Sequence, residues 1–222
     1  MKIAAGFDIP KFLVGSCGRF GVITEVTFKV FPAPQSWLTH RIPCANATDA
    51  TDRIAQAASS RWELDALDYV PDEASLFARL GGPAEANTAL AGEIQRTGPG
   101  ATILTDADAN SLWSRLREFT WAHADGVLAK IPITLSTLAS IASVAAKIHG
   151  ARAHFSAAGN VAYVSLPSTD AVPSLDAELR SLNLAGLVLR GNAAPMRLGI
   201  SRVPSIAEAV RAVFDPERRF AD

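Results

Sequence analysis

The stretch Gly15-Ser16-Cys17-Gly18-Arg19-Phe20-Gly21 leads directly into Val22-Ile23-Thr24-Glu25-Val26-Thr27-Phe28-Lys29-Val30. Three glycines at a spacing of three precede a run in which apolar and polar residues alternate. Glycine accepts positive φ at little cost and lets a backbone or a ligand approach closely, and alternation with a period of two is typical of a half-buried strand. The stretch therefore predicts a loop with an exposed backbone that feeds a β-strand. The face of that strand expected to be buried carries Val22, Val26, Phe28 and Val30.

Residues on both sides of the loop make the motif more specific. Gly6-Phe7-Asp8-Ile9-Pro10-Lys11 precedes it, and Ile23-Thr24-Glu25 follows it. The segment resembles the end of the FAD-binding domain in flavoproteins of the vanillyl-alcohol-oxidase or PCMH type, where Gly-Tyr-Asp-Leu precedes Gly-Ser-x-Gly-x-Leu-Gly-Val-Ile-Thr-Glu. It looks most similar to the FAD-binding subunit of bacterial glycolate oxidase, although Cys17, Arg19 and Phe20 are less usual choices.

The resemblance implies that this loop binds FAD, largely through backbone groups. Amides and carbonyls can reach a cofactor only where no side chain intervenes, and this explains why small residues dominate the loop. The cofactor-binding residues implied by the resemblance are Gly15, Ser16, Cys17, Gly18, Gly21, Val22 and Ile23.

The family's FAD-binding domain also has an N-terminal half whose glycine-rich loop holds the pyrophosphate, and the resemblance places that half before Met1. The other glycine clusters here, Gly81-Gly82 and Gly98-Pro99-Gly100, are interpreted as turns. We therefore expect the chain to be the C-terminal part of such a flavoprotein, inactive alone.

Proline residues predict the domain organisation. Pro32-Ala33-Pro34 ends the predicted strand, so residues 1–34 are assigned to the C-terminal part of the FAD-binding domain. Residues 35–203 are assigned to an α+β substrate-type domain, and 204–222 to a helix and tail that return to the FAD-domain side. The tail's Phe214-Asp215-Pro216 matches the family's closing motif, whereas Ala221-Asp222 departs from it.

Periodicity in the middle of the chain predicts the order β-α-β-β-α-β twice, joined by a linking helix at 108–122. Two such units can form one antiparallel sheet with helices on a single face, which leaves the other face free to meet a partner. The predicted strands are 37–44, 64–70, 74–80, 101–105, 126–133, 152–157, 161–166 and 185–190. The predicted helices are 48–62, 83–96, 134–149, 174–182 and 204–214.

Composition excludes several classes of protein. The net charge of -1 and dispersed basic residues do not favour nucleic acid or an anionic membrane. The longest apolar stretch, 135–148, is too short and too polar to span a bilayer. Two cysteines and four histidines without ligand spacing predict no metal site and no disulfide scaffold, so a cytoplasmic protein is expected.

Oxidation of a 2-hydroxy acid by a flavin needs a base near the α-hydrogen or hydroxyl and a cation for the carboxylate. Lys130 and Arg190 stand where the glycolate oxidase family tends to carry basic or polar strand residues, and His154 lies on a central strand. These three are the catalytic candidates. Alternatively, each is a solvated strand residue or a hydrogen-bonded core histidine.

The resemblance implies an FAD-linked 2-hydroxy-acid oxidoreductase subunit. Its partners would be a larger flavin subunit and an iron-sulfur subunit, or a second copy of the chain. A non-catalytic α+β interaction module that docks through its open sheet face is the alternative. A third interpretation, a small-molecule-binding regulatory domain of ferredoxin-like type, would need a closed polar pocket between helices and sheet, and no sequence feature points to one.

Overall fold

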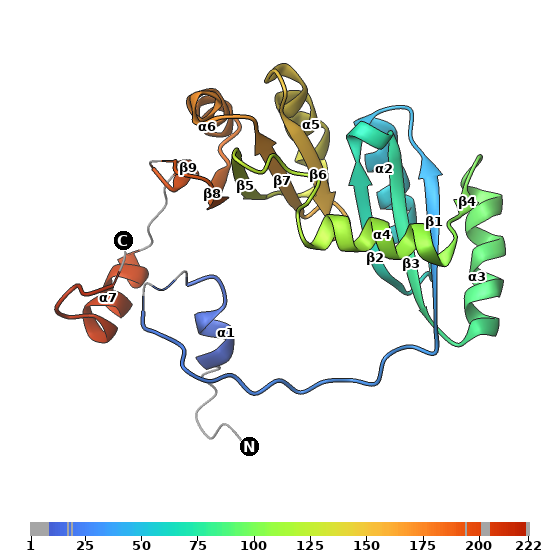
Figure 1. Cartoon of the computed structure of the whole chain (residues 1–222), viewed down its shortest axis with the longest axis horizontal. Helices are drawn as coiled ribbons and strands as arrows, with labels where there is room; N and C mark the ends of the chain where they lie inside the picture. The colour runs from blue at the N-terminus through green and yellow to red at the C-terminus, as the bar shows by residue number, and fades with distance from the viewer. Residues whose placement is uncertain (1–8, 17, 19, 194, 201–204, 221–222) are drawn as a thin grey trace. The chain divides into compact units, whose positions relative to one another are not determined.

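The computed structural model describes residues 9–16, 18, 20–193, 195–200 and 205–220. The chain divides into two compact units, one formed by Met1–Pro32 with Arg202–Asp222 and the other by Ala33–Ser201. Figure 1 labels the elements of both. The assignment of the first unit to a FAD-binding domain stays a prediction.

The larger unit is built on one sheet, in which nine strands of the described residues pair in the order β4-β1-β3-β2-β6-β7-β5-β8-β9. Each neighbouring pair is antiparallel. The strands are β1 (Ser36–Pro43), β2 (Leu64–Val70), β3 (Ser75–Gly82), β4 (Thr102–Ile103), β5 (Val127–Pro132), β6 (Arg152–Ser156), β7 (Val161–Leu166), β8 (Ala185–Arg190) and β9 (Arg197–Gly199).

The sheet contains two repeats of the predicted order, which confirms the α+β class. The first is β1-α2-β2-β3-α3-β4, and the second is β5-α5-β6-β7-α6-β8. Numbered within its repeat, each set of strands has the spatial order 4-1-3-2, and the repeats meet through their second strands, β2 and β6. The repeats are therefore related by an approximate two-fold operation at the β2–β6 junction. Their helices are α2 (Ala47–Ala58), α3 (Ala84–Thr97), α5 (Leu138–Lys147) and α6 (Val172–Ser181).

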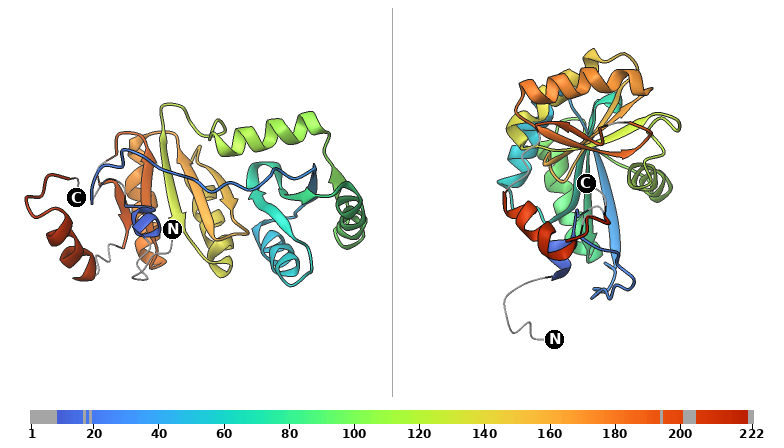
Figure 2. Two further views of the ribbon diagram at one scale, coloured as in Figure 1. Left: turned by 90° about the horizontal axis from the view of Figure 1, so that it is seen from below. Right: turned by 90° about the vertical axis from the view of Figure 1, so that its left-hand side faces the viewer.

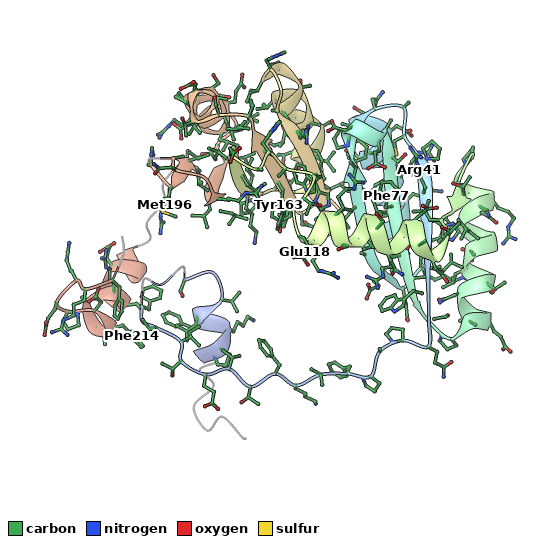
Figure 3. The ribbon with its side chains drawn as sticks, in the orientation of Figure 1. Arg41, Phe77, Glu118, Tyr163, Met196 and Phe214 are labelled. Atoms are coloured by element: carbon green, nitrogen blue, oxygen red, sulfur yellow. The ribbon has the colours of Figure 1, made fainter. Side chains whose placement is uncertain are left out.

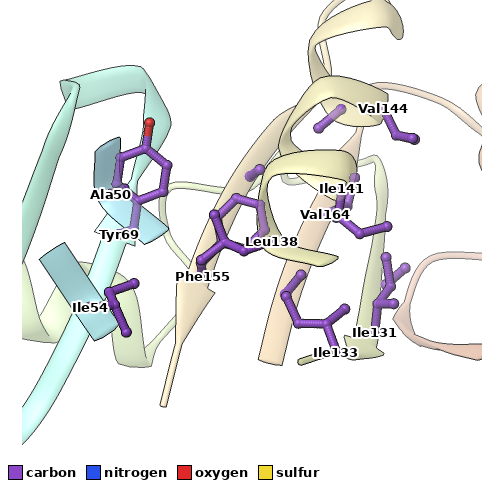
Figure 4. Close-up of a cluster of buried hydrophobic side chains, with 14 of the residues drawn as sticks. Ala50, Ile54, Tyr69, Ile131, Ile133, Leu138, Ile141, Val144, Phe155 and Val164 are labelled. Carbon is purple, nitrogen blue, oxygen red and sulfur yellow. The ribbon is translucent and has the colours of Figure 1, made fainter. Parts of the chain in front are cut away.

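The four repeat helices contribute to one hydrophobic core against a single face of the sheet, as expected. Their inward side chains include Ile54, Ile94, Leu138 and Leu175, each at most 1% exposed. Alternate strand residues such as Phe155 complete this core, part of which is drawn in Figure 4. Burial of alternate residues follows from the two-residue period of a strand.

The linking helix α4 (Asp106–Arg117) packs on the opposite face, which the sequence pattern left uncovered. Its Leu112 and Leu116 join a second, smaller core with Val70, Phe77 and Leu128. Figure 2 shows α4 on one side of the sheet and α2 and α5 on the other. One face of the sheet is thus fully covered by helices, and the other is covered in part.

The strand predicted from Gly21 is wrong: residues 21–34 form neither helix nor strand. The side chains expected to be buried are exposed, with Val22 at 78%, Phe28 at 79% and Val30 at 82%. A strand forms only where a neighbour accepts and donates its backbone hydrogen bonds, and no described segment pairs with this one. The alternating pattern is present, but its partner is not among the described residues.

Some helices and strands begin or end at residues other than those predicted from the sequence. Helix α2 ends at Ala58, four residues early, because the hydroxyls of Ser59 and Ser60 donate to the carbonyls of Gln56 and Ala57. Strand β4 has two residues where five were predicted, and the three-residue β9 was missed. Elements this short carry too little periodicity to be recognised.

In the smaller unit, helices α1 (Ile9–Leu13) and α7 (Ser205–Phe214) meet through aromatic rings. Phe12 stacks on Phe20 with ring centroids 4.9 Å apart, and Phe214 lies 5.6 Å from Phe12. The carboxylate of Asp215 accepts hydrogen bonds from the backbone N–H groups of Arg219 and Phe220. These hydrogen bonds hold the C-terminal tail against the end of α7, whose Phe214 packs near Phe20 of the glycine loop.

Candidate functional site

The glycine loop has the backbone that its sequence predicts. Gly15, Gly18 and Gly21 have φ values of 77°, 78° and 153°, in the region where other residues are strained. A Cβ on any of the three would meet no atom within 4 Å. Conformation rather than crowding therefore requires these glycines, and the space beside the backbone is open to a ligand.

The other predicted cofactor-binding residues are placed unevenly. Ser16 donates its backbone N–H to the Leu13 carbonyl at 3.1 Å, which closes the turn after α1. Val22 and Ile23 follow outside any helix or strand and are exposed. Cys17 lies outside the described residues, as do Gly6 and Asp8, which the resemblance also used, and Arg19, which departs from the family pattern. The role of the loop as a flavin site stays a prediction.

A row of polar and aromatic side chains crosses the second sheet face, and the strand register defines it. Arg41 pairs with Phe77, which pairs with Asp68, and beyond the junction His154 pairs with Tyr163, which pairs with Lys130. The two halves of this row, which we call the cross-strand row, are related by the two-fold operation between the repeats. Its members, in spatial order, are Arg41, Phe77, Asp68, His154, Tyr163 and Lys130.

The centre of the row is a buried hydrogen bond between the repeats. His154 Nε2 lies 2.8 Å from Asp68 Oδ2, and the side chains are only 4% and 7% exposed. On the opposite face, Tyr69 and Phe155 stack with centroids 5.9 Å apart and form the one residue pair in register between β2 and β6. A buried carboxylate is costly unless paired, so this bond stabilises the junction only while both partners are present.

Aromatic rings enclose His154. The Trp121 ring meets it edge-on at 5.8 Å, and the Tyr163 ring stacks beside it at 5.7 Å. Within the described residues, His154 Nδ1, Asp68 Oδ1 and Trp121 Nε1 are buried without a hydrogen-bond partner. His154 is therefore a buried histidine that can orient Tyr163, and it does not itself reach the surface.

Tyr163 is half-buried and is labelled in Figure 3. Burial raises the pKa of the Tyr163 hydroxyl, and the negative charge of Asp68 adds to this shift. Tyr163 consequently stays protonated at neutral pH and can donate a hydrogen bond. Lys130, its neighbour across β5 and β7, is also half-buried, and the described residues offer its ammonium group no ion pair or hydrogen bond.

Arg190 lies apart from the row. Its Nη2 donates to the His123 carbonyl at 3.0 Å, and Arg152 Nη1 donates to the Trp121 carbonyl at 2.7 Å. Both arginines thus hold the segment after α4 against the sheet. The structure brings Lys130 and His154 together around Tyr163, whereas Arg190 holds the segment after α4 against the sheet.

Sequence reasoning missed Asp68 and Tyr163. One signal was available for Asp68, because an aspartate inside the strand Leu64–Val70 is followed by two apolar residues and is rarely buried without a partner. The register that joins Tyr163 to His154 and Lys130 could not be read from the sequence.

Among the described residues, no group of three or more His, Cys, Asp or Glu side chains is placed to hold a metal ion. None of the helices in this part of the chain has the length and apolar character needed to cross a membrane.

No family model matches the chain. Among curated proteins, D-lactate dehydrogenase of Anaerostipes hadrus is 30% identical over 112 residues, which are 50% of this chain and 22% of that protein. Glycolate oxidase subunit GlcE of Escherichia coli (strain K12) is 30% identical over 118 residues, 53% of this chain and 30% of the relative. Subunit GlcD of Bacillus subtilis (strain 168) is 26% identical over 111 residues, 48% of this chain and 23% of the relative.

The chain matches less than a third of the length of each of these relatives. Their names nevertheless agree with the interpretation of the glycine loop and its flanks. The chain is similar over about half of its length to glycolate oxidase subunits and D-lactate dehydrogenase, which confirms its resemblance to the glycolate oxidase type of protein.

Proposed function

We propose that the chain is one component of an FAD-linked oxidoreductase that acts on a 2-hydroxy acid. The observation that carries the proposal is the glycine loop, whose positive-φ backbone opens onto free space in a chain similar to glycolate oxidase subunits. A cofactor held through backbone amides and carbonyls fits such a loop, because no side chain stands in its way. When bound, FAD would accept two electrons from the substrate in the form of a hydride, and the hydroxyl proton of the substrate would leave separately.

The exposed segment that follows the loop supports action within a larger assembly. Its alternating residues, such as Phe28 and Val30, have strong strand propensity and lack a neighbour in the described structure. We propose that another polypeptide segment or a subunit pairs with this segment. Two of the relatives are themselves named as subunits.

The open end of the cross-strand row offers groups suited to a 2-hydroxy acid. Lys130 would hold the carboxylate through its ammonium group, and the protonated Tyr163 would hydrogen-bond the substrate hydroxyl. His154 and Asp68 would act as positioning residues, since His154 stacks beside Tyr163 and bonds to the buried Asp68. Arg190 has a smaller part in this proposal because its guanidinium already donates to His123.

Titration of FAD with the full chain, followed by flavin fluorescence anisotropy, tests the proposal. We expect saturable binding that weakens roughly tenfold in Gly18→Ala, since alanine would shift the loop away from this positive φ and returning it to the binding conformation costs about 1–2 kcal/mol. Gly92→Ala, a substitution on helix α3, is the matched control and should leave binding unchanged. An anisotropy that does not change with protein concentration would overturn the proposal.

A non-catalytic module that docks through its sheet face is a second candidate. Leu189 on β8 and Met196 before β9 are exposed by 45% and 61%, and Met196 is labelled in Figure 3. Exposed apolar residues at a sheet face are typical of interaction surfaces. Flavin binding without a change in oligomeric state favours the oxidoreductase. Self-association lost in a Leu189→Ser variant, without flavin binding, favours the module.

A further inference from the structure

We propose that a cavity formed between α4 and the first repeat binds a small zwitterionic molecule of the amino-acid type. The cavity has a volume of about 440 Å³. It lies in the range of small-molecule pockets and is lined by two tryptophans, one arginine, one aspartate and several amide or hydroxyl groups. The residues that carry the argument are Trp37, Arg79, Ile103, Asp106, Asn110 and Trp113.

Arg79 is the centre of the cavity. Its guanidinium lies 3.6 Å from the Trp37 ring centroid and 5.8 Å from that of Trp113. Asp65 approaches at 3.7 Å, which is within ion-pair range and beyond hydrogen-bond distance. The indoles therefore fix the plane of a guanidinium whose N–H groups donate no hydrogen bond to any described residue. A planar, oriented guanidinium matches the two oxygens of a carboxylate.

The walls of the cavity are held in place by the fold. Trp113 donates its indole N–H to the Thr39 hydroxyl at 2.9 Å, which attaches α4 to strand β1. The Trp37 ring covers Gly81, where a Cβ would come within 2.5 Å of Trp37 Cζ3. Glycine at this position is thus required for the ring to lie against the sheet beside Arg79.

The charge at the cavity decides the class of ligand. Asp106 and Asn110, one turn apart on α4, line the same space as Arg79, and no described residue bonds to either side chain. A simple anion would satisfy the guanidinium but would be repelled by Asp106 and by the nearby Asp65. A molecule with both a carboxylate and an ammonium group satisfies Arg79 and Asp106 together. Ile103 and the indoles provide an apolar wall for its side chain.

This site is separate from the proposed flavin loop, and it does not depend on the proposed oxidoreductase function. A small-molecule-binding regulatory domain needs a closed polar pocket between helices and sheet, and this cavity is a polar pocket between α4 and the sheet that is partly open to solvent. The structure places that pocket in the first repeat.

Isothermal titration calorimetry of the full chain with L-leucine tests the assignment, with tryptophan fluorescence as a second readout because Trp37 and Trp113 flank Arg79. We expect saturable binding with a dissociation constant in the millimolar range or tighter. Leucinamide lacks the carboxylate, and 2-hydroxyisocaproate replaces the ammonium by a hydroxyl. Both should bind at least about tenfold more weakly, since a charge-assisted hydrogen bond is lost.

Variants locate the site. Arg79→Lys keeps the charge but loses the planar pair of donors, and Arg79→Gln and Asp106→Asn each remove one charge. All three should weaken leucine binding. Arg117→Gln and Asp52→Asn change exposed residues outside the cavity and should not. A thermal unfolding curve for each variant confirms folding. Three results would each overturn the proposal: no saturable heat or fluorescence change up to about 10 mM leucine, leucine binding unaltered by the cavity variants, or binding of the hydroxy acid that equals that of leucine and is lost in Arg79→Gln. Binding of the hydroxy acid that survives in Arg79→Gln belongs to the second repeat and leaves the cavity assignment intact.

Discussion

The two repeats have the same topology, yet they treat the second face of the sheet differently. Phe77 in the first repeat and Tyr163 in the second occupy equivalent register positions, and α4 covers Phe77 to 1% exposure, whereas Tyr163 is half-buried. Arg41 and Lys130 are equivalent as well. Arg41 donates to the Ser75 hydroxyl and the Glu73 carbonyl, but no described residue binds Lys130. Along the cross-strand row, the first repeat buries its aromatic side chain under α4, and the second keeps a tyrosine and a lysine available for chemistry.

The junction between the repeats should be the most sensitive point. His154→Ala would leave the Asp68 carboxylate buried without its partner, so we expect a loss of about 3–5 kcal/mol in the free energy of unfolding. Chemical denaturation measures this value. Asp68→Leu combined with His154→Leu should recover most of the loss, since no buried charge is then left without a partner. Loss of less than about 1 kcal/mol in His154→Ala would show that the bond does not join the repeats.

The contrast between Phe77 and Tyr163 can be measured directly. Phe77→Ala should cost about 3–5 kcal/mol, as is typical for a fully buried aromatic side chain. Tyr163→Ala should cost about half as much, because its ring remains partly solvated in the folded state. Denaturation curves for both variants decide the point. Equal losses would mean that both repeats close their second face to the same extent.

A third difference between the repeats lies on the covered face. His40 on β1 is fully buried where the second repeat has Ala129, and neither nitrogen of its ring has a hydrogen-bond partner in the described part of the chain. Burial lowers the pKa of His40, so the unfolded chain takes up a proton at higher pH than the folded protein.

Stability should therefore fall as the pH drops below about 6.5, by up to about 1.4 kcal/mol per pH unit for this group. His40→Leu removes the titrating ring and should flatten that part of the stability profile between pH 6.5 and the lowered pKa. Urea unfolding at several pH values gives the slope. An unchanged slope in His40→Leu would assign the acid sensitivity to other residues.

The smallest expected effect is the difference in stability loss between variants of Arg41 and Lys130. Arg41→Met should cost about 1 kcal/mol, because the Ser75 hydroxyl and the Glu73 carbonyl lose a charged donor that is partly exposed. Lys130→Met should change stability by less than about 0.5 kcal/mol. Thermal unfolding of the two variants is the measurement. A larger loss in Lys130→Met would indicate that Lys130 has a structural role, and it would weaken the case for a substrate contact.

Local patterns in the sequence predicted most of the larger unit, because each repeat helix has an apolar stripe and each strand is bounded by turn residues. They could not predict the face chosen by α4, since that depends on where Leu112 and Leu116 find a partner surface. The strand after Gly21 was predicted from a real alternation, and it failed because pairing needs a neighbour.

The candidate site was predicted only in part. His154 and Lys130 were identified as isolated basic residues. Register alone brings them to either side of Tyr163, and register depends on pairings between residues far apart in the sequence. The same limit hid Asp68, which lies 86 positions before His154 in the chain.

Hydrogen exchange of the full chain, with and without saturating FAD, tests both the flavin loop and the proposed substrate contacts of the second repeat. We expect FAD to slow exchange of backbone amides between Gly15 and Thr24. Addition of a 2-hydroxy acid should protect amides around Lys130 and Tyr163 on β5 and β7 and leave those around Arg41 and Phe77 on β1 and β3 unchanged. Protection confined to the first repeat, or none at all, would contradict both the assignment of the loop to FAD and the assignment of the substrate contacts to the second repeat.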